Sequence, residues 1–284
     1  MTLLNGSITK GDKTVLSRHK IVIRGAGDLA SGVAARLWRS GFPVIMTEIE
    51  QPLTVRRTVS FSDAVYEEET TVEGIRARRV DKASQALEAI AAGVIPVCVD
   101  PEATIVGQID PYAVIDAIMA KRNVGTRISD APFVVGLGPG FTAGQDVHAV
   151  VETKRGHTLG RVIWQGEAIP NTGIPGEIKG IGEKRVIRAP AEGVFRGICK
   201  IGTHVEEDDI VGYAGDTPVR APIPGMLRGL LHDDVFVAQG LKSGDVDPRD
   251  IEESCWTISD KALAIGGGVL EAVLTVINRT ANFP

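Results

Sequence analysis

The feature that most constrains the fold is a strand–turn–helix–strand pattern that begins at residue 21. The apolar, β-branched run Ile21-Val22-Ile23 leads into Gly25 and Gly27, and apolar residues then recur at helical spacing. A second apolar run covers 44–46, just after Gly41. A strand, a helix and a second strand within about 30 residues make a βαβ unit. The pattern therefore predicts parallel strands joined by a right-handed crossover.

The alternation continues along the chain. Residues 82–92 have helical periodicity, and the apolar run 94–99 follows Gly93. Segment 111–123 is ambiguous: Asp110-Pro111 resembles a helix start, whereas Val114-Ile115 would suit a short strand, and we favour the helix. After an N-terminal extension over 1–19, we expect an α/β domain over 20–184 with a Rossmann-like, doubly wound parallel sheet.

The character of the sequence changes near residue 185. The segment RAPAEGVFRG at 188–197 recurs as RAPIPGMLRG at 220–229, a spacing of 32 residues with six of ten positions identical. Two related β units predict a small all-β module over 185–250, and they resemble the barrel-sandwich fold of biotinyl/lipoyl carriers. The hairpin 213–219 lacks the lysine that carriers acylate, which favours a structural or interaction module. Residues 251–284 are expected to end in a helix that packs back on the α/β domain.

Composition and charge narrow the classes of function. The chain has 31 Lys and Arg against 36 Asp and Glu, and this balance argues against a nucleic-acid partner. No apolar stretch is long enough for a membrane span and the start is polar, so we expect a cytoplasmic protein with no membrane partner. The five histidines and the dispersed Cys98, Cys199 and Cys255 show no metal-ligand spacing, so no structural metal is expected.

The turn after the first strand matches the dinucleotide-binding pattern. It reads Gly25-x-Gly27-x-x-Ala30 between a predicted strand and a predicted helix. Such glycines let a phosphate approach the backbone amides of the helix, and an acid at the end of the next strand accepts hydrogen bonds from a ribose. The predicted ligand-binding residues here are Gly25, Ala26, Gly27, Asp28, Leu29 and Glu48. The alternative is a plain βα turn, because an acidic Asp28 would repel a phosphate unless it caps the helix or faces away.

Two later segments supply further candidate residues. Gly138, Pro139 and Gly140 follow a predicted strand without the Gly-Lys-Ser/Thr ending of a P-loop, so they could line the same pocket or form an ordinary turn. Glu152, Arg155 and His157 share one short loop that could bind an anion, move a proton or be a polar hairpin tip. No catalytic residue is assigned. Cys255 could act as a soft ligand or sulfur donor, although buried, unreactive thiols are more common.

Five segments together resemble a known family. They are IRGAGDLA at 23–30, QPLTVRRTV at 51–59, LGPGF at 137–141, ETKRGH at 152–157 and ISDKALAI at 258–265. They look like the selenium-dependent molybdenum hydroxylase accessory family (YqeB-type), which is distantly similar to xanthine dehydrogenase maturation proteins. The resemblance implies a maturation factor that binds a molybdopterin-type cofactor or a dinucleotide and whose partner is a client molybdenum hydroxylase.

Two other classes of function remain open from the sequence. One is an NAD(P)-dependent oxidoreductase that uses the Gly25 turn with Glu48 on the ribose. The other is a non-enzymatic scaffold whose glycine turns are only structural. Base rates for soluble proteins also favour a homodimer.

Overall fold

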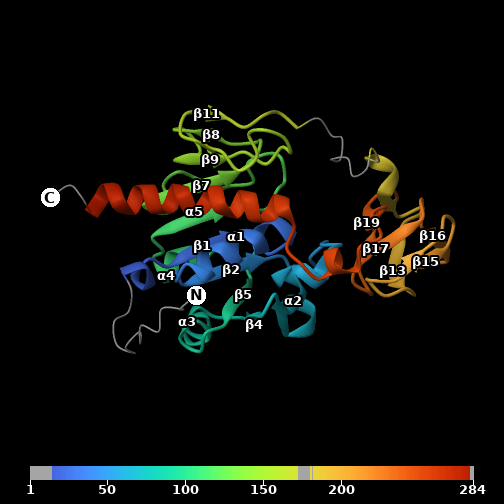
Figure 1. The fold of residues 1–284 in the computed structure, drawn as a ribbon. Helices are drawn as coiled ribbons and strands as arrows, with labels where there is room; N and C mark the ends of the chain where they lie inside the picture. The colour runs from blue at the N-terminus through green and yellow to red at the C-terminus, as the bar shows by residue number, and fades with distance from the viewer. Residues whose placement is uncertain (1–14, 172–179, 181, 282–284) are drawn as a thin grey trace, which may run out of the picture.

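The computed structural model describes residues 15–171, 180 and 182–281. Figure 1 shows a large sheet, crossed by the long helix α5 (Asp260–Ala281), and a smaller body made of strands beside it. Most of the predicted extension 1–19 lies outside the described residues, and only η1 (Val15–Arg18) precedes the first strand. Among the helices that the structure describes, none could cross a membrane.

The larger part of the molecule is built on a nine-stranded sheet with the order β10-β9-β7-β6-β1-β2-β5-β4-β3. The seven central strands run parallel, whereas β10 and β3 at the two edges run antiparallel to their neighbours. The strands are β1 (Ile21–Arg24), β2 (Val44–Glu48), β3 (Glu69–Val72), β4 (Ile75–Val80), β5 (Ile95–Val99), β6 (Ala113–Asp116), β7 (Phe133–Leu137), β9 (Ala149–Val151) and β10 (Val162–Ile163). A separate small sheet pairs β8 (Thr142–Ala143) with β11 (Gly166–Glu167).

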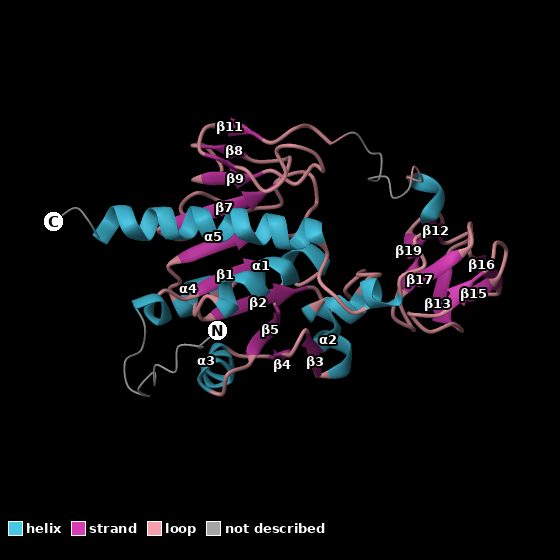
Figure 2. Cartoon of the chain, viewed as in Figure 1, coloured by secondary structure: helices cyan, strands magenta, loops and turns pink. Residues whose placement is uncertain are grey.

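Both faces of the large sheet are covered, which explains the uninterrupted apolar runs of its central strands. Ile21 and Ile23 of β1 join the core beneath α1 (Asp28–Arg39) and α5, whereas Val22 joins the core beneath α3 (Ala83–Ala91) and α4 (Val106–Ile109). The remaining helical turns are α2 (Ala64–Glu67), η2 (Arg57–Val59), η3 (Phe61–Asp63), η4 (Glu183–Arg185) and η5 (Glu252–Cys255). Figure 2 shows that the long helices lie against this sheet.

Helices α1 and α5 pack at very short range because small residues meet at their crossing. A Cβ built on Gly32 of α1 would lie 2.6 Å from Cβ of Ala262, and one built on Gly266 would lie 2.7 Å from the carbonyl oxygen of Gly32. Ser259 caps α5, since its Oγ accepts a hydrogen bond from the backbone N–H of Ala262 at 3.2 Å. The start of α5 is thereby fixed beside the start of α1.

The smaller part, here called the β module, consists of two four-stranded antiparallel sheets with a shared apolar core. Their orders are β12-β19-β17-β14 and β16-β15-β13-β18. The strands are β12 (Val186–Arg188), β13 (Gly193–Gly197), β14 (His204–Val205), β15 (Ile210–Ala214), β16 (Thr217–Arg220), β17 (Gly225–Leu230), β18 (Phe236–Val237) and β19 (Lys242–Asp247). The module joins the larger part where the backbone N–H of Leu230 donates to the carbonyl oxygen of Val55 at 2.8 Å.

The predicted fold class, a doubly wound Rossmann-like sheet with a barrel-sandwich module, is wrong as a description of this architecture. The large sheet is mixed, and no helix joins β6 to β7 or β7 to β9 in the described chain between them. The chain instead forms several antiparallel sheets, and the two copies of the repeated segment contribute β13 and β17 to different sheets. The helix predicted over 111–123 is also wrong, because 113–116 form β6 between β1 and β7.

Candidate functional site

A cavity of about 420 Å³ opens where the carboxyl ends of β1, β6, β7 and β9 face the β module. Its walls come from segments far apart in the sequence, including Leu29 on α1, Met119 after β6, Pro139 after β7 and Ser259 before α5. The carboxyl edge of parallel strands is where open α/β sheets bind their ligands. The place and the volume are therefore those of a small-molecule site.

Positive charge dominates the lining of this cavity. Four arginines (Arg56, Arg155, Arg185 and Arg228) and four lysines (Lys121, Lys154, Lys242 and Lys261) line it. Only two lining residues are acidic, Asp28 and Asp245. What the cavity can bind therefore depends on which of these charges are already neutralised by other protein groups.

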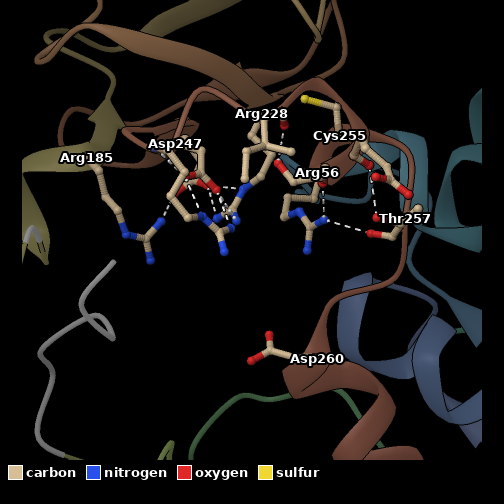
Figure 3. Close-up of polar contacts among 12 residues, drawn as sticks. Arg56, Arg185, Arg228, Asp247, Cys255, Thr257 and Asp260 are labelled. Carbon is tan, nitrogen blue, oxygen red and sulfur yellow. Dashed lines mark hydrogen bonds and ion pairs between the residues drawn. The ribbon is translucent and has the colours of Figure 1, made fainter. Parts of the chain in front are cut away.

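Two of the arginines, Arg56 and Arg155, are held by partners at the edge of the cavity, and Figure 3 shows Arg56 beside Thr257. Buried Arg56 pairs with Asp28 at 3.0 Å and also donates to the carbonyl oxygens of Ser254 (3.0 Å) and Thr257 (3.2 Å). Arg155 forms two hydrogen bonds with the carboxylate of Asp260, at 2.6 and 3.0 Å. This bidentate pair lowers the pKa of Asp260 to about 2.

The other two arginines belong to an ion-pair cluster of the β module. Arg228 on β17 donates from Nε to Asp245 at 2.9 Å and from Nη1 to Asp247 at 2.9 Å. Arg185 pairs with the same Asp245, and Arg249 pairs with Asp247 at 2.6 Å. Both carboxylates are buried on β19. Three guanidinium groups thus share two carboxylates, so the cluster neutralises most of its own charge and keeps one positive charge in excess.

The four lysines are different, because none of them makes an ion pair within the described part of the chain. Desolvation lowers the pKa of Lys242; the charge of Asp245 opposes this shift, whereas Arg185 and Arg228 add to it. Desolvation also lowers the pKa of Lys261, and Arg155 adds to the effect. These ammonium groups face a shared space without carboxylate partners of their own.

The nearby carboxylates are engaged elsewhere. Buried Glu152 accepts hydrogen bonds from the backbone N–H groups of Lys154 (2.7 Å) and Ile169 (2.8 Å). Asp260 is occupied by Arg155, and Asp245 by Arg228. The loop after β9 is thus folded by Glu152 so that Lys154 and Arg155 reach the cavity wall.

The Gly25 turn is filled by protein groups. The carbonyl oxygen of Ala117 lies 3.1 Å from the Cβ position of Gly25, and Thr54 Oγ1 lies 3.2 Å from that of Gly27. Asp28 stands on the first turn of α1 and is paired with Arg56. A phosphate bound at this turn would therefore lie beside the carboxylate of Asp28 and the hydroxyl of Thr54.

The predicted ligand-binding residues, taken together, fall into two groups: those that line the cavity and those that do not. Asp28, Leu29, Pro139 and Arg155 line it. The predicted residues outside its lining are Gly25, Ala26, Gly27, Glu48, Gly138, Gly140, Glu152 and His157. Burial raises the pKa of Glu48, whose carboxylate accepts the backbone N–H of Ile49 at 2.8 Å. His157 is exposed.

Sequence reasoning did not select the lysines. Lys154 adjoins the predicted Arg155, and Lys261 lies within one of the segments that carried the resemblance, so a search for basic residues at strand ends would have found Lys154. Lys121 and Lys242 had no such signal. Across the described residues, no group of three or more His, Cys, Asp or Glu is arranged to hold a metal ion. Cys255 is fully buried, and burial raises the pKa of its thiol.

No protein-family model matches the chain. Three solved structures resemble it at low TM-scores. One is a succinylglutamate desuccinylase from Silicibacter (TM-score 0.23, 13% identity, 80% of this chain and 84% of that one). The second is an aspartoacylase family protein from Mesorhizobium loti (TM-score 0.25, 7% identity, 80% of this chain and 84% of that one). The third is a succinylglutamate desuccinylase/aspartoacylase from Rhodobacter sphaeroides (TM-score 0.24, 14% identity, 80% of this chain and 86% of that one).

The predicted role as a maturation factor for a selenium-dependent molybdenum hydroxylase is wrong. It placed a pterin phosphate or a nucleotide at the Gly25 turn, where the structure instead holds the Asp28–Arg56 ion pair and the Thr54 hydroxyl.

The resemblance to YqeB itself has direct support. The chain is 51% identical over 259 residues to the uncharacterized protein YqeB of Escherichia coli (strain K12). The match takes in 91% of this chain and 48% of that protein. The chain is therefore a relative of YqeB that spans about half the length of that protein.

Proposed function

We propose that the chain binds a small organic anion with at least two carboxylate or phosphate groups in the cavity between the large sheet and the β module. The observation that carries the proposal is the presence of four lysines without carboxylate partners around one space of about 420 Å³. Ammonium groups brought together in a partly desolvated site repel one another, and an anion that enters relieves this repulsion.

The arginines contribute in another way. Arg56, Arg155 and Arg228 are each fixed by carboxylates at 2.6 to 3.0 Å, so they shape the walls and leave less charge for a ligand. The free lysines come from four different segments and surround the space from several sides. A ligand with one anionic group satisfies only part of this arrangement, which favours a dicarboxylate, a tricarboxylate or a bisphosphate.

The test is a calorimetric titration of the purified chain with citrate, with inorganic pyrophosphate and with neutral glycerol at low salt. We expect one of the two anions to bind and glycerol not to bind. Lys242→Gln and Lys261→Gln should each weaken that binding by about tenfold, equivalent to about 1.4 kcal/mol. Raising the salt concentration should weaken it further, because charge supplies the affinity.

The matched control is Lys200→Gln, because Lys200 is exposed on the β module and does not line the cavity. It should bind the anion as the unchanged chain does. Equal affinity in the Lys242, Lys261 and Lys200 variants would contradict the proposal, as would the absence of binding by both anions. A preference for citrate over pyrophosphate, or the reverse, identifies carboxylate or phosphate as the recognised group.

A further inference from the structure

The loop that follows β6, residues 117–126, carries two of the residues that line the cavity, Met119 and Lys121. Both have a left-handed backbone conformation, with φ of 63° for Met119 and 62° for Lys121. Residues other than glycine rarely adopt this conformation, and it persists where surrounding contacts impose it. The position of Lys121 therefore depends on the residues that hold the loop.

A buried carboxylate holds the loop near both of its ends. Asp116, the last residue of β6, accepts the backbone N–H of Ile118 on Oδ1 at 3.1 Å. Thr126 Oγ1 donates to Oδ2 of the same carboxylate at 2.5 Å. Asp116 and Thr126 are 1% and 2% exposed. One side chain thus ties the start of the loop to its end, on either side of Lys121.

Arg24 continues this hydrogen-bond network into the neighbouring strand. It is the last residue of β1, which runs parallel to β6, and its Nη1 donates to Thr126 Oγ1 and lies 3.7 Å from Asp116 Oδ2. A threonine hydroxyl has one proton, so it accepts from Arg24 while it donates to Asp116. Without this hydroxyl, a buried carboxylate oxygen and a buried guanidinium would each lose a partner, which costs free energy.

Two further contacts fix the part of the loop after Lys121. Asn123 Oδ1 accepts the backbone N–H of Thr126 at 2.9 Å, and Asn123 Nδ2 donates to the carbonyl oxygen of Thr126 at 2.7 Å. The backbone of Arg122 lies against the turn after β7, where a Cβ built on Gly140 would be 2.7 Å from Cα of Arg122. The backbone that carries Lys121 is therefore fixed on both sides by protein groups.

We propose that Thr126, together with Asp116, is a positioning residue of the anion site and holds the loop so that the ammonium group of Lys121 faces the bound anion. The inference rests on the proposed function, because it assigns no ligand of its own. It adds that the backbone of one cavity lysine is set before the ligand arrives. Such preorganisation lowers the entropy lost on binding and so raises the affinity.

The test is a double-mutant cycle, measured by calorimetric titration of the full chain with citrate and with inorganic pyrophosphate. We expect Thr126→Val, which replaces the hydroxyl by a methyl group, to weaken binding by about fivefold, and Thr126→Ser, which keeps the hydroxyl, by less than about twofold. In a Lys121→Gln background, Thr126→Val should change the affinity by less than about twofold. In a Lys242→Gln background, it should keep its effect of about fivefold.

Thr104→Val is the matched control for the loss of a hydroxyl. Thr104 Oγ1 also donates to an aspartate, Asp100 Oδ1 at 3.1 Å, but the residue follows β5 and does not line the cavity. This variant should bind the anion as the unchanged chain does. Asn123→Ala loosens the same loop at a less buried position than Thr126. It should weaken binding in the unchanged chain and have little effect once Lys121 is replaced by Gln.

The outcomes separate this inference from the anion site. If neither citrate nor pyrophosphate binds to the unchanged chain, the anion site fails and the positioning role fails with it. If one of them binds and Thr126→Val keeps full affinity, or loses as much in the Lys121→Gln background as in the unchanged chain, the positioning role is overturned and the anion site stands. Thermal denaturation shows whether Thr126→Val folds, and Asn123→Ala is judged by the same criterion if it does not.

Discussion

At the scale of single residues, the ion-pair cluster of the β module makes a strong prediction. Asp247 is buried and accepts hydrogen bonds from Arg228 and Arg249 at 2.6 to 3.0 Å. Asp247→Asn removes the charge but keeps the shape, so two guanidinium groups lose a partner. Breaking a buried pair costs about 3 to 5 kcal/mol, and we expect a loss of about 3 kcal/mol in the free energy of unfolding by urea at pH 7.

The same residue predicts a pH dependence. Burial alone would raise the pKa of Asp247, but hydrogen bonds from Arg249 and the charge of Arg228 hold it below its ordinary value. Its stabilising effect is therefore complete above about pH 4, the unfolded pKa, and is lost as the pH falls through the lower folded pKa. Asp247→Asn should flatten this decline, whereas Asp216→Asn, at an exposed hairpin tip, should change neither stability nor slope. An equal loss in both variants would contradict the cluster's role.

Sequence reasoning at this scale found some of the cavity and missed its charge. Pro139 and Arg155 were predicted because a glycine-rich turn and a loop of mixed charge can each be recognised from a few consecutive residues. Both residues line the cavity. Lys121 and Lys242 look like ordinary surface lysines in the sequence. They become candidate ligand-binding residues only because the tertiary structure places them around one cavity without carboxylate partners.

At the scale of elements, the crossing of α1 and α5 reverses the usual effect of glycine in a helix. Replacing a helical glycine with alanine in solvent is favourable by about 1 kcal/mol. At Gly32, however, the new Cβ would lie 2.6 Å from Cβ of Ala262. We expect Gly32→Ala to lower the free energy of unfolding by about 1 to 3 kcal/mol, because overpacking forces the helices apart. Thermal and urea denaturation measure this change.

Gly267 on α5 is the matched control for the crossing. It lies one residue from the contact point, and a Cβ built on it has no neighbour within 4 Å. Gly267→Ala should therefore raise the free energy of unfolding by about 0.5 to 1 kcal/mol. Destabilisation by both substitutions, or by neither, would mean that the crossing does not depend on close contact.

The elements themselves were predicted unevenly. Periodicity correctly indicated β1, α1, β2, α3, β5 and β7, since each has a clear apolar period and a glycine or proline near its end. It failed at 111–123, where Val114 and Ile115 pair on both sides as part of β6. A strand of four residues between two others is stabilised by its neighbours more than by its own pattern.

At the scale of the whole molecule, the cavity depends on how the β module is seated. Gly229 of β17 lies against the backbone of Val55, and a Cβ there would be 3.0 Å from the carbonyl oxygen of Val55. Gly229→Val should push β17 outward and move Arg228 and Lys242 away from α5. We expect citrate affinity to fall by about tenfold, with circular dichroism unchanged.

Gly107→Ala provides the comparison, because Gly107 lies in α4 and a Cβ there would meet nothing within 4 Å. It should bind citrate normally. Unchanged affinity in the Gly229 variant would show that the seating of the module does not define the cavity. The overall arrangement was the least predictable level: the sequence predicted a C-terminal helix that packs back on the α/β domain, but it did not indicate that this helix, α5, would cover the same face of the sheet as α1.

The two antiparallel edge strands have a consequence for how copies of the chain meet. β10 has only two residues, and β3 carries Glu69, which is held by Arg76 and Arg78 at 3.2 and 2.6 Å. Another strand would pair poorly with either edge of the sheet, because edge strand β10 is short and edge strand β3 is charged. We therefore expect that copies of the chain do not pair through the edges of this sheet, and that a high protein concentration does not join their sheets into a longer one.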